Sequence, residues 1–166
     1  MAQHPTLPVA QPAPPGLWVI HCDGSAIPNP GRMGLGATLL APDGQQHSLS
    51  LTSSLVGCNN EAELRALIAA LQHAHALGAR AVAVCSDSTI LIEQLQPPQP
   101  DKRAPAPIAR LAEWFDNARA WLARFDSVQL QWIPRHRNSA ADTLARAALG
   151  APAKVAQHPS HKKKKR

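Results

Sequence analysis

Four acidic residues stand where apolar segments of the chain begin or end, and their type suits chemistry with bound cations. They are Asp23, Glu63, Asp87 and Asp142. The whole chain has only eleven acidic residues, so these four are a large share of them. If the fold brings the boundaries together, the four carboxylates raise one another's pKa values unless a cation lies between them.

Hard divalent cations relieve that repulsion. Mg²⁺ prefers oxygen ligands and keeps several of its waters, and Mn²⁺ accepts the same kind of ligand. Two such ions about 4 Å apart activate a water molecule and stabilise the leaving oxygen in phosphoryl transfer. The four carboxylates therefore predict hydrolysis of a phosphodiester with two Mg²⁺ ions, with Mn²⁺ as an alternative.

Each acid also has an ordinary structural interpretation. Asp23 precedes a glycine, and Asp-Gly is a common turn dipeptide, so the acid is also explained as the end of a strand. Glu63 and Asp142 each follow a possible N-cap residue by three positions, and Asp87 stands before a short predicted helix. Helix capping accounts for three of the acids separately, but it does not explain why Asp23 accompanies them.

The elements expected to hold these acids follow from hydrophobic periodicity. Alternating apolar residues and a Pro-Asp-Gly turn predict antiparallel strands at residues 17–23, 34–41 and 45–53. Helices are predicted at 63–77, 88–95, 108–125 and 138–149, and two further strands at 81–85 and 128–132. Strands joined through helices tend to run parallel, so this order indicates an α/β fold with a mixed sheet covered by helices.

Length and composition favour one folded domain, at residues 17–150, between two tails. Residues 1–16 are rich in proline without an apolar block, and residues 151–166 end in the basic run Lys162–Arg166, so we expect both to be disordered. The basic run is either a solubilising end or a non-specific tether for nucleic acid. No membrane-spanning segment, secretion signal or zinc-type cysteine spacing is present, so we expect a cytoplasmic monomer.

Four short motifs lie in one order along the chain: DGS…PNPG at 23–31, NNEAEL at 59–64, CSDS at 85–88 and WIPRHRNSAADTLA at 132–145. Together they resemble type 1 ribonuclease H over nearly the whole predicted domain. The resemblance implies a five-stranded mixed sheet flanked by helices, with three antiparallel strands followed by two parallel ones. It also implies an endonuclease that hydrolyses the RNA strand of RNA/DNA hybrids and leaves 3′-hydroxyl and 5′-phosphate ends. Asp23 would bridge both metal ions, and Glu63, Asp87 and Asp142 would complete the site.

The resemblance further implies which residues contact the hybrid. They are Gly24, Asn29, Asn59, Asn60 and Asn138. Amide side chains both donate and accept hydrogen bonds, which suits the 2′-hydroxyls and base edges in the minor groove of an A-like duplex. Glycine lets a backbone approach closely. Alternatively, Asn29 serves its Pro-Asn-Pro-Gly turn, Asn60 is the N-cap of a helix, and Asn138 caps a helix or orients water.

His136 lies between two arginines, six residues before Asp142, in the segment where many family members carry a histidine on a mobile loop. By this resemblance it would support catalysis as a proton carrier. A lone histidine near a site is also commonly structural or solvated, so both interpretations of His136 stay open.

The basic protrusion that some family members use to bind the hybrid would fall at residues 97–107. That segment is rich in proline here, and only Lys102 and Arg103 in it are basic. The chain therefore resembles a handle-less branch of the family.

Two other functions stay open at this point. A hybrid-binding module without activity would have the same fold, although clustered carboxylates facing phosphates would not help a pure binder. Nucleases of the same superfold that act on DNA use similar acids, but the paired asparagines at 59 and 60 and the DGS turn favour an RNA/DNA hybrid.

Overall fold

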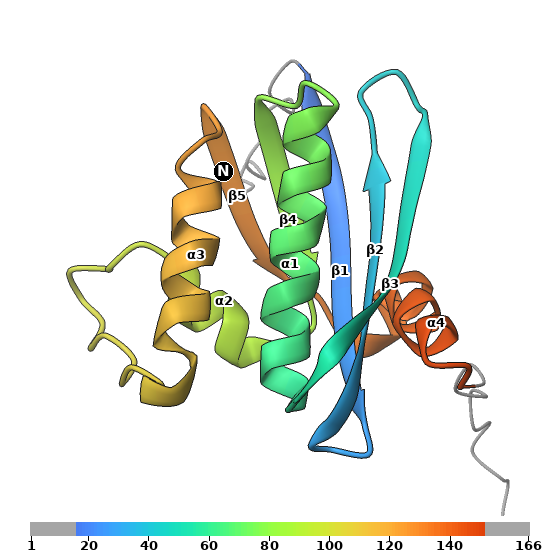
Figure 1. The fold of residues 1–166 in the computed structure, drawn as a ribbon. Helices are drawn as coiled ribbons and strands as arrows, with labels where there is room; N and C mark the ends of the chain where they lie inside the picture. Colours follow the sequence, from blue (N-terminus) through green and yellow to red (C-terminus); the bar gives the residue numbers. More distant parts are fainter. Residues whose placement is uncertain (1–15, 152–166) are drawn as a thin grey trace, which may run out of the picture.

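The computed structural model describes residues 16–151, which form a five-stranded sheet with helices on both faces (Figure 1). The strands are β1 (Leu17–Ile27), β2 (Gly31–Leu40), β3 (Gln46–Gly57), β4 (Ala81–Ser86) and β5 (Ser127–Trp132). The helices are α1 (Asn59–Ala76), α2 (Thr89–Leu95), α3 (Ala112–Leu122) and α4 (Ser139–Ala148), with 3₁₀ turns η1 (Ala109–Leu111) and η2 (Arg135–Arg137). None of the helices in this described part is long and apolar enough to cross a membrane. The predicted disorder of the two tails falls almost entirely on residues 1–15 and 152–166, which lie outside the described residues.

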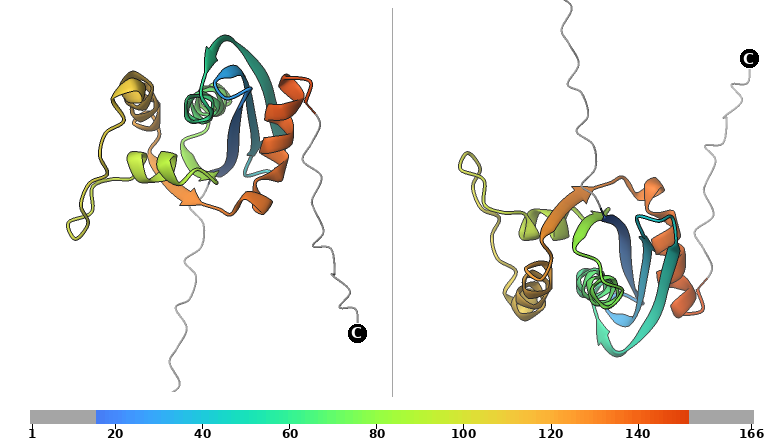
Figure 2. Two further views of the ribbon diagram at one scale, coloured as in Figure 1. Left: turned by 90° about the horizontal axis from the view of Figure 1, so that it is seen from below. Right: turned by 90° about the horizontal axis from the view of Figure 1, so that it is seen from above.

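The sheet has the strand order β3-β2-β1-β4-β5. β1 pairs antiparallel with β2 and β2 with β3, whereas β1 pairs parallel with β4 and β4 with β5. This confirms the predicted mixed sheet of three antiparallel strands followed by two parallel ones. α1 and α3 pack together over one face of the sheet, and α4 lies on the other face (Figure 2).

β1 extends beyond Asp23, where the strand was predicted to end. Asp23 pairs with Gly36 of β2, and this antiparallel ladder continues to Ile27. The parallel pairing with β4 ends earlier, at His21 opposite Cys85. The interpretation of Asp23 as a strand-ending turn residue is wrong, because the ladder with β2 runs through the Asp-Gly dipeptide. Asp23 instead lies where β1 runs past the end of β4.

α1 begins at Asn59, four residues before its predicted start, and its predicted apolar face is buried. The N–H of Asn59 donates to Oδ1 of Asn29, in the turn between β1 and β2, at 3.2 Å. The Oδ1 atom of Asn59 in turn accepts from the N–H of Ala26 at 2.8 Å. The interpretation of Asn60 as the N-cap is wrong, since the N-cap residue is Cys58 and an amide from outside the helix bonds the first turn.

The predicted helix at 108–125 is shorter in the structure. The turn η1 precedes α3, and Leu111 and Phe125 are buried in the core although neither belongs to α3. Apolar periodicity alone does not separate a 3₁₀ turn or a tight loop from an α-helix. Between α2 and η1 the described chain contains no helix, in line with the handle-less branch.

Two glycines of β2 let α4 lie directly on the sheet. A Cβ atom at Gly34 would overlap the carbonyl of Ala145, and one at Gly36 would overlap the carbonyl of Ala141. Any side chain at either position would push α4 outward. These glycines therefore fix the distance between α4, which carries Asp142, and the strand beside Asp23.

Hydroxyl groups of β3 hold the far end of α4. Ser50 Oγ donates to the carbonyl of Leu144 at 2.7 Å, and Thr52 Oγ1 donates to the carbonyl of Ala148 at 2.8 Å. The last four carbonyls of a helix have no partner within it, so the bond from Thr52 satisfies one of them, while Ser50 bonds the turn before it. The edge strand and the last helix are thereby connected.

Candidate active site

Asp23 is the most enclosed of the four predicted acids, with 8% of its surface exposed. Burial raises the pKa of Asp23, and the charges of Asp87, Glu63 and Asp142 and a hydrogen bond with the Asp142 carboxyl raise it further, to about 8. The structure therefore brings together acids from β1, α1, the end of β4 and α4, although they are widely separated in sequence. This clustering is what the sequence analysis required for metal-assisted chemistry.

Glu63 lies in the first turns of α1, directly against β1. Its pKa is raised to about 7, because burial and the charge of Asp87 raise it more than a hydrogen bond with Ser88 and the charge of Arg135 lower it. A Cβ atom at Gly24 would overlap the backbone of Ala62 and Glu63. Gly24 is therefore the residue that allows Glu63 to approach Asp23, a packing role that differs from the predicted contact with nucleic acid.

Asp87 is held by Asn138, whose side chain is only 1% exposed. The Nδ2 atom of Asn138 donates to Asp87 Oδ1 at 2.7 Å and to the carbonyl of Cys22 at 2.9 Å. Its side chain makes no capping bond to α4. This burial favours the interpretation of Asn138 as a residue that positions Asp87 over direct contact with nucleic acid.

Two arginines that the sequence analysis did not include bond to the acids. Arg135 Nε lies 3.4 Å from Asp87 Oδ2, and Arg146 Nε lies 3.4 Å from Asp142 Oδ1. Arg146 follows Asp142 by four residues on a helix, a spacing that already indicates an ion pair. No comparable sequence signal identifies Arg135, because its partner is 48 residues away.

The remaining predicted residues lie around this cluster with different exposure. Asn29 and Asn59 are exposed and bond one another and β1, so they fasten the corner where α1 begins. Asn60 is partly exposed, and His136 is exposed in η2 beside Arg135. Contact of these residues with nucleic acid, and a proton-carrying role for His136, stay predictions.

The carboxylates are the type of ligand that a divalent cation prefers, but their side chains are not positioned around a common point. Among residues 16–151 no three His, Cys, Asp or Glu side chains are placed, as they stand, to hold one metal ion. Asp87 and Asp142 bond arginines instead. The donors themselves are hard oxygens, which Mg²⁺ prefers. One further oxygen, Oδ1 of Asn138, is buried without a hydrogen-bond partner in the described part of the chain.

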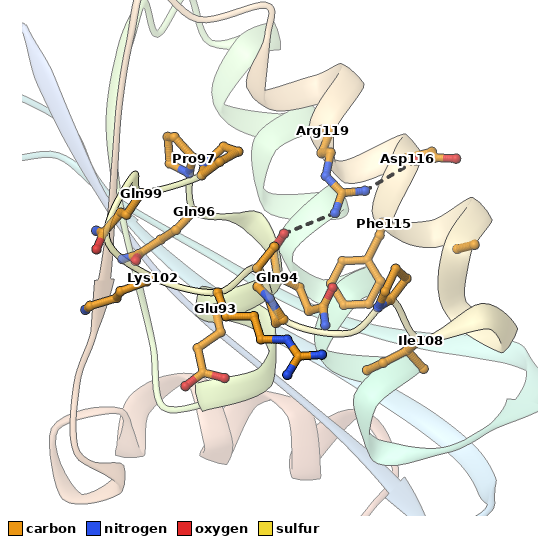
Figure 3. A pocket seen from close by; sticks show the side chains of 16 residues that line it. Glu93, Gln94, Gln96, Pro97, Gln99, Lys102, Ile108, Phe115, Asp116 and Arg119 are labelled. Carbon is orange, nitrogen blue, oxygen red and sulfur yellow. Dashed lines mark hydrogen bonds and ion pairs between the residues drawn. The ribbon is translucent and has the colours of Figure 1, made fainter.

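A pocket of about 750 Å³ lies away from these acids, between α2, α3 and the proline-rich segment (Figure 3). Phe115 and Ile108 form part of its apolar wall. Arg119 spans one side, where it donates to the carbonyl of Gln94 at 3.0 Å and pairs with Asp116 at 3.3 Å. None of the predicted site residues lines this pocket, so it is separate from the acidic cluster.

Comparisons with known proteins agree with this arrangement. The family described as reverse transcriptase-like matches residues 21–148, a span that contains all four acids. Ribonuclease HI of Halobacterium salinarum is 32% identical over 145 residues, which are 85% of this chain and 68% of that protein. The chain belongs to the ribonuclease H family. This family generally depends on divalent metal ions.

A second relative of this ribonuclease H chain is the bifunctional protein Rv2228c of Mycobacterium tuberculosis, 37% identical over 142 residues. The match covers 83% of this chain but only 37% of that protein, so the chain spans little more than a third of the relative's length. The solved N-terminal RNase H domain of the same relative superposes with a TM-score of 0.68 and 33% identity, covering 81% of this chain and 94% of that one.

Two more solved structures share the ribonuclease H fold of this chain. RNase H1 of Halobacterium salinarum has a TM-score of 0.71 and 31% identity, with 81% of this chain and 98% of that chain covered. LC11-RNase H1, solved in complex with an RNA/DNA hybrid, has a TM-score of 0.68 and 29% identity, with 80% and 96% covered.

Proposed function

We propose that this chain is an endonuclease that hydrolyses the RNA strand of RNA/DNA hybrids and leaves 3′-hydroxyl and 5′-phosphate ends. The observation that carries the proposal is the enclosure of Asp23 among three other acids; its burial, together with their charges, raises its pKa to about 8. A binding module without activity has no use for such a repulsive cluster. Membership of the ribonuclease H family and the hybrid bound to LC11-RNase H1 support the choice of substrate.

Two Mg²⁺ ions, or Mn²⁺ in their place, are the proposed cofactors. Asp23, Glu63, Asp87 and Asp142 would hold them, with Asp23 shared between both. Bound divalent ions supply an activated water and stabilise the leaving oxygen of a phosphodiester. Arg135 and Arg146 each bond one oxygen, of Asp87 and Asp142 respectively, at 3.4 Å, so they compete with a cation for those two oxygens.

The residues around the acids have separate tasks in this proposal. Asn138 keeps Asp87 fixed against β1 through its two donated hydrogen bonds. Gly24 keeps α1 close enough for Glu63 to face Asp23. His136, exposed on η2, carries a proton to or from solvent near the cluster.

Recognition of the hybrid is assigned to the corner formed by the turn after β1 and the start of α1. Asn29, Asn59 and Asn60 lie there with their side chains at least partly exposed. Their amides suit the 2′-hydroxyls of a wide minor groove, which distinguish an RNA strand from DNA. The cytoplasm is the proposed location, and the three cysteines of the described chain are all free, as a reducing compartment favours.

The experiment uses a labelled RNA/DNA hybrid, a DNA duplex and an RNA duplex, each with Mg²⁺, Mn²⁺ or chelator. We expect cleavage of the hybrid's RNA strand with metal only, and loss of cleavage in Asp23→Asn. Asp126→Asn is the matched control, because Asp126 is an exposed acid paired only with Arg80. Cleavage that survives Asp23→Asn would refute the assigned site, and hybrid binding without any cleavage would indicate the binding module instead.

A further inference from the structure

One of the four tryptophans differs from the others in its surroundings. Trp18, Trp114 and Trp121 are partly buried against the core, and each contacts an aromatic ring or an arginine. Trp132 is 51% exposed and has no aromatic or cation–π partner among residues 16–151. A ring of this size left open to water calls for a physical reason, since burial of an indole is strongly favourable.

The exposed ring of Trp132 is nevertheless fixed in position. Its Nε1–H donates to the carbonyl of Asp87 at 3.2 Å, so the polar edge of the indole is satisfied by the protein. Trp132 is also the last residue of β5, paired with Ser86 of β4. The ring is therefore attached to the same backbone segment that carries one of the site acids, and its height relative to that acid is set by the sheet.

Two arginines follow Trp132 on the next loop, and one of them shares the partner Asp87 with it. Arg135 is 77% exposed in its side chain and reaches back to Asp87 Oδ2 at 3.4 Å, and Arg137 is exposed in the same turn. β5 forms the edge of the sheet, so no further strand of the described chain covers it. Trp132 and Arg135 are thus joined through Asp87 and are both exposed. Exposed aromatic rings together with cationic side chains are the groups with which proteins bind single-stranded nucleic acid.

We propose that Trp132 and Arg135 form a binding subsite for an unpaired nucleotide of the substrate next to the acidic cluster. The inference rests on the proposed function, because it needs a nucleic acid strand at those acids. Trp132 stacks on the base, and Arg135 bonds the adjoining phosphate. Bases inside a duplex are already stacked on their neighbours, so the ring selects a base at a single-stranded extension or a junction.

The consequence is a preference among hybrids. A hybrid with a single-stranded RNA extension gains one stacked base that a blunt hybrid lacks. Stacking of one base on an aromatic side chain changes affinity by about tenfold. We expect this preference at both low and moderate salt, since stacking is not a counterion effect, while the contribution of Arg135 weakens as salt increases.

The test measures binding by fluorescence anisotropy in chelator, so that no strand is cut. The probes are a blunt RNA/DNA hybrid and the same hybrid with a six-nucleotide RNA extension at the 5′ or the 3′ end. We expect the wild-type protein to bind one extended hybrid about tenfold more tightly than the blunt one. Trp132→Ala should bind the extended and the blunt hybrid equally well, whereas Trp132→Phe should keep most of the preference. Arg135→Gln lowers the slope of log affinity against log salt by about 0.7, because one phosphate is no longer neutralised.

Leu77→Ala is the control, because Leu77 is an apolar residue of similar exposure (41%) that follows the C-terminal end of α1, whereas the site acid Glu63 lies near the start of this helix. The ratio of its affinities for the extended and the blunt hybrid should equal that of the wild type. An unchanged ratio in Trp132→Ala, or no preference in the wild type, overturns the proposal. A preserved preference in a protein that never cleaves the hybrid would instead contradict the proposed function and leave the subsite standing.

Discussion

The antiparallel and parallel parts of the sheet hold their acids in different ways. In the antiparallel part, contacts that only glycine permits set the positions: Gly24 lies on α1 and Gly36 on α4. In the parallel part, side-chain hydrogen bonds set them, because Asn138 and Trp132 both donate to Asp87. A glycine in contact with another backbone cannot be replaced by a larger residue unless the backbone moves. A side-chain hydrogen bond, in contrast, is lost on substitution while the backbone stays in place. The two parts should therefore fail differently when they are altered.

Asp23 lies at the junction of both parts, and the largest effect is expected there. Burial and neighbouring acids raise the pKa of Asp23 to about 8 and that of Glu63 to about 7. Between about pH 4 and pH 8 the metal-free folded protein holds protons that the unfolded chain has released, so its free energy of unfolding falls as pH rises through this window. Asp23→Asn removes the central charge and should raise the free energy of unfolding at pH 9 in chelator by about 3 kcal/mol.

Urea denaturation at pH 5 and pH 9 with chelator measures this difference. The same variant should lose at least about 10³-fold in cleavage rate, the scale of losing a charged group that acts in the transition state. Mg²⁺ should raise the free energy of unfolding of the wild type at pH 9 but change that of the variant much less. A variant less stable than the wild type at pH 9 would show that the burial of the Asp23 charge and its repulsion by the other acids do not dominate stability there.

Gly24→Ala tests the antiparallel part. Its Cβ would overlap the backbone of Ala62 and Glu63, so α1 must shift. We expect a decrease of about 3 kcal/mol in the free energy of unfolding, together with loss of cleavage. Gly44→Ala is the control, because Gly44 has a φ of +90° but open space around it. That substitution should cost about 1 kcal/mol from backbone strain alone and leave cleavage intact. Equal decreases of stability in both variants would contradict the close-contact explanation.

Asn138→Ala tests the parallel part. The substitution leaves the carbonyl of Cys22 and one oxygen of Asp87 without a donor, at a cost of about 1–3 kcal/mol in stability. Because Asp87 then loses its orientation, the Mg²⁺ concentration for half-maximal cleavage should rise about 10- to 100-fold. Gln94→Ala, which removes an exposed bond to Ala106, should change neither quantity. If the Mg²⁺ concentration for half-maximal cleavage is unchanged in Asn138→Ala, Asn138 contributes to stability but does not orient Asp87 for metal binding.

The smallest effect concerns the basic run Lys162–Arg166, outside both parts of the sheet and outside the described residues. We propose that it supplies non-specific affinity for nucleic acid. Deleting it should flatten the salt dependence of hybrid binding, by about 0.9 in log-log slope for each phosphate that the run neutralises, with little change in turnover at saturating substrate. Binding curves with an unchanged slope would leave the run a solubilising end.

The sequence predicted the acids and the sheet better than it predicted the interactions that hold them. Asp23, Glu63, Asp87 and Asp142 were identifiable because each stands beside an apolar segment within a recognisable motif. The parallel direction of the last two strands followed from the helices that precede them. The end of β1 was not predictable, because turn propensity of Asp-Gly is local while the ladder to β2 is set by residues far along the chain.

Long-range side-chain bonds at the site escaped prediction for the same reason. Arg135 reaches an acid 48 residues away, and Asn29 bonds the start of a helix 30 residues away. Neither spacing repeats in the sequence, so no periodicity reveals it. Arg146 was not predicted either, although its spacing of four residues from Asp142 on a helix is a signal that could have identified this ion pair.

The hydroxyl bonds from Ser50 and Thr52 to α4 make the outer strand part of the framework that holds the acidic cluster. If β3 opened at its edge, α4 would lose two of its attachments, and Asp142 would move with the helix. Amide hydrogen exchange should therefore record β3 and α4 as one cooperative unit, although β2 lies between β3 and the acids. Slow exchange in both elements would mean that the edge strand β3 helps to keep α4, and with it Asp142, in position.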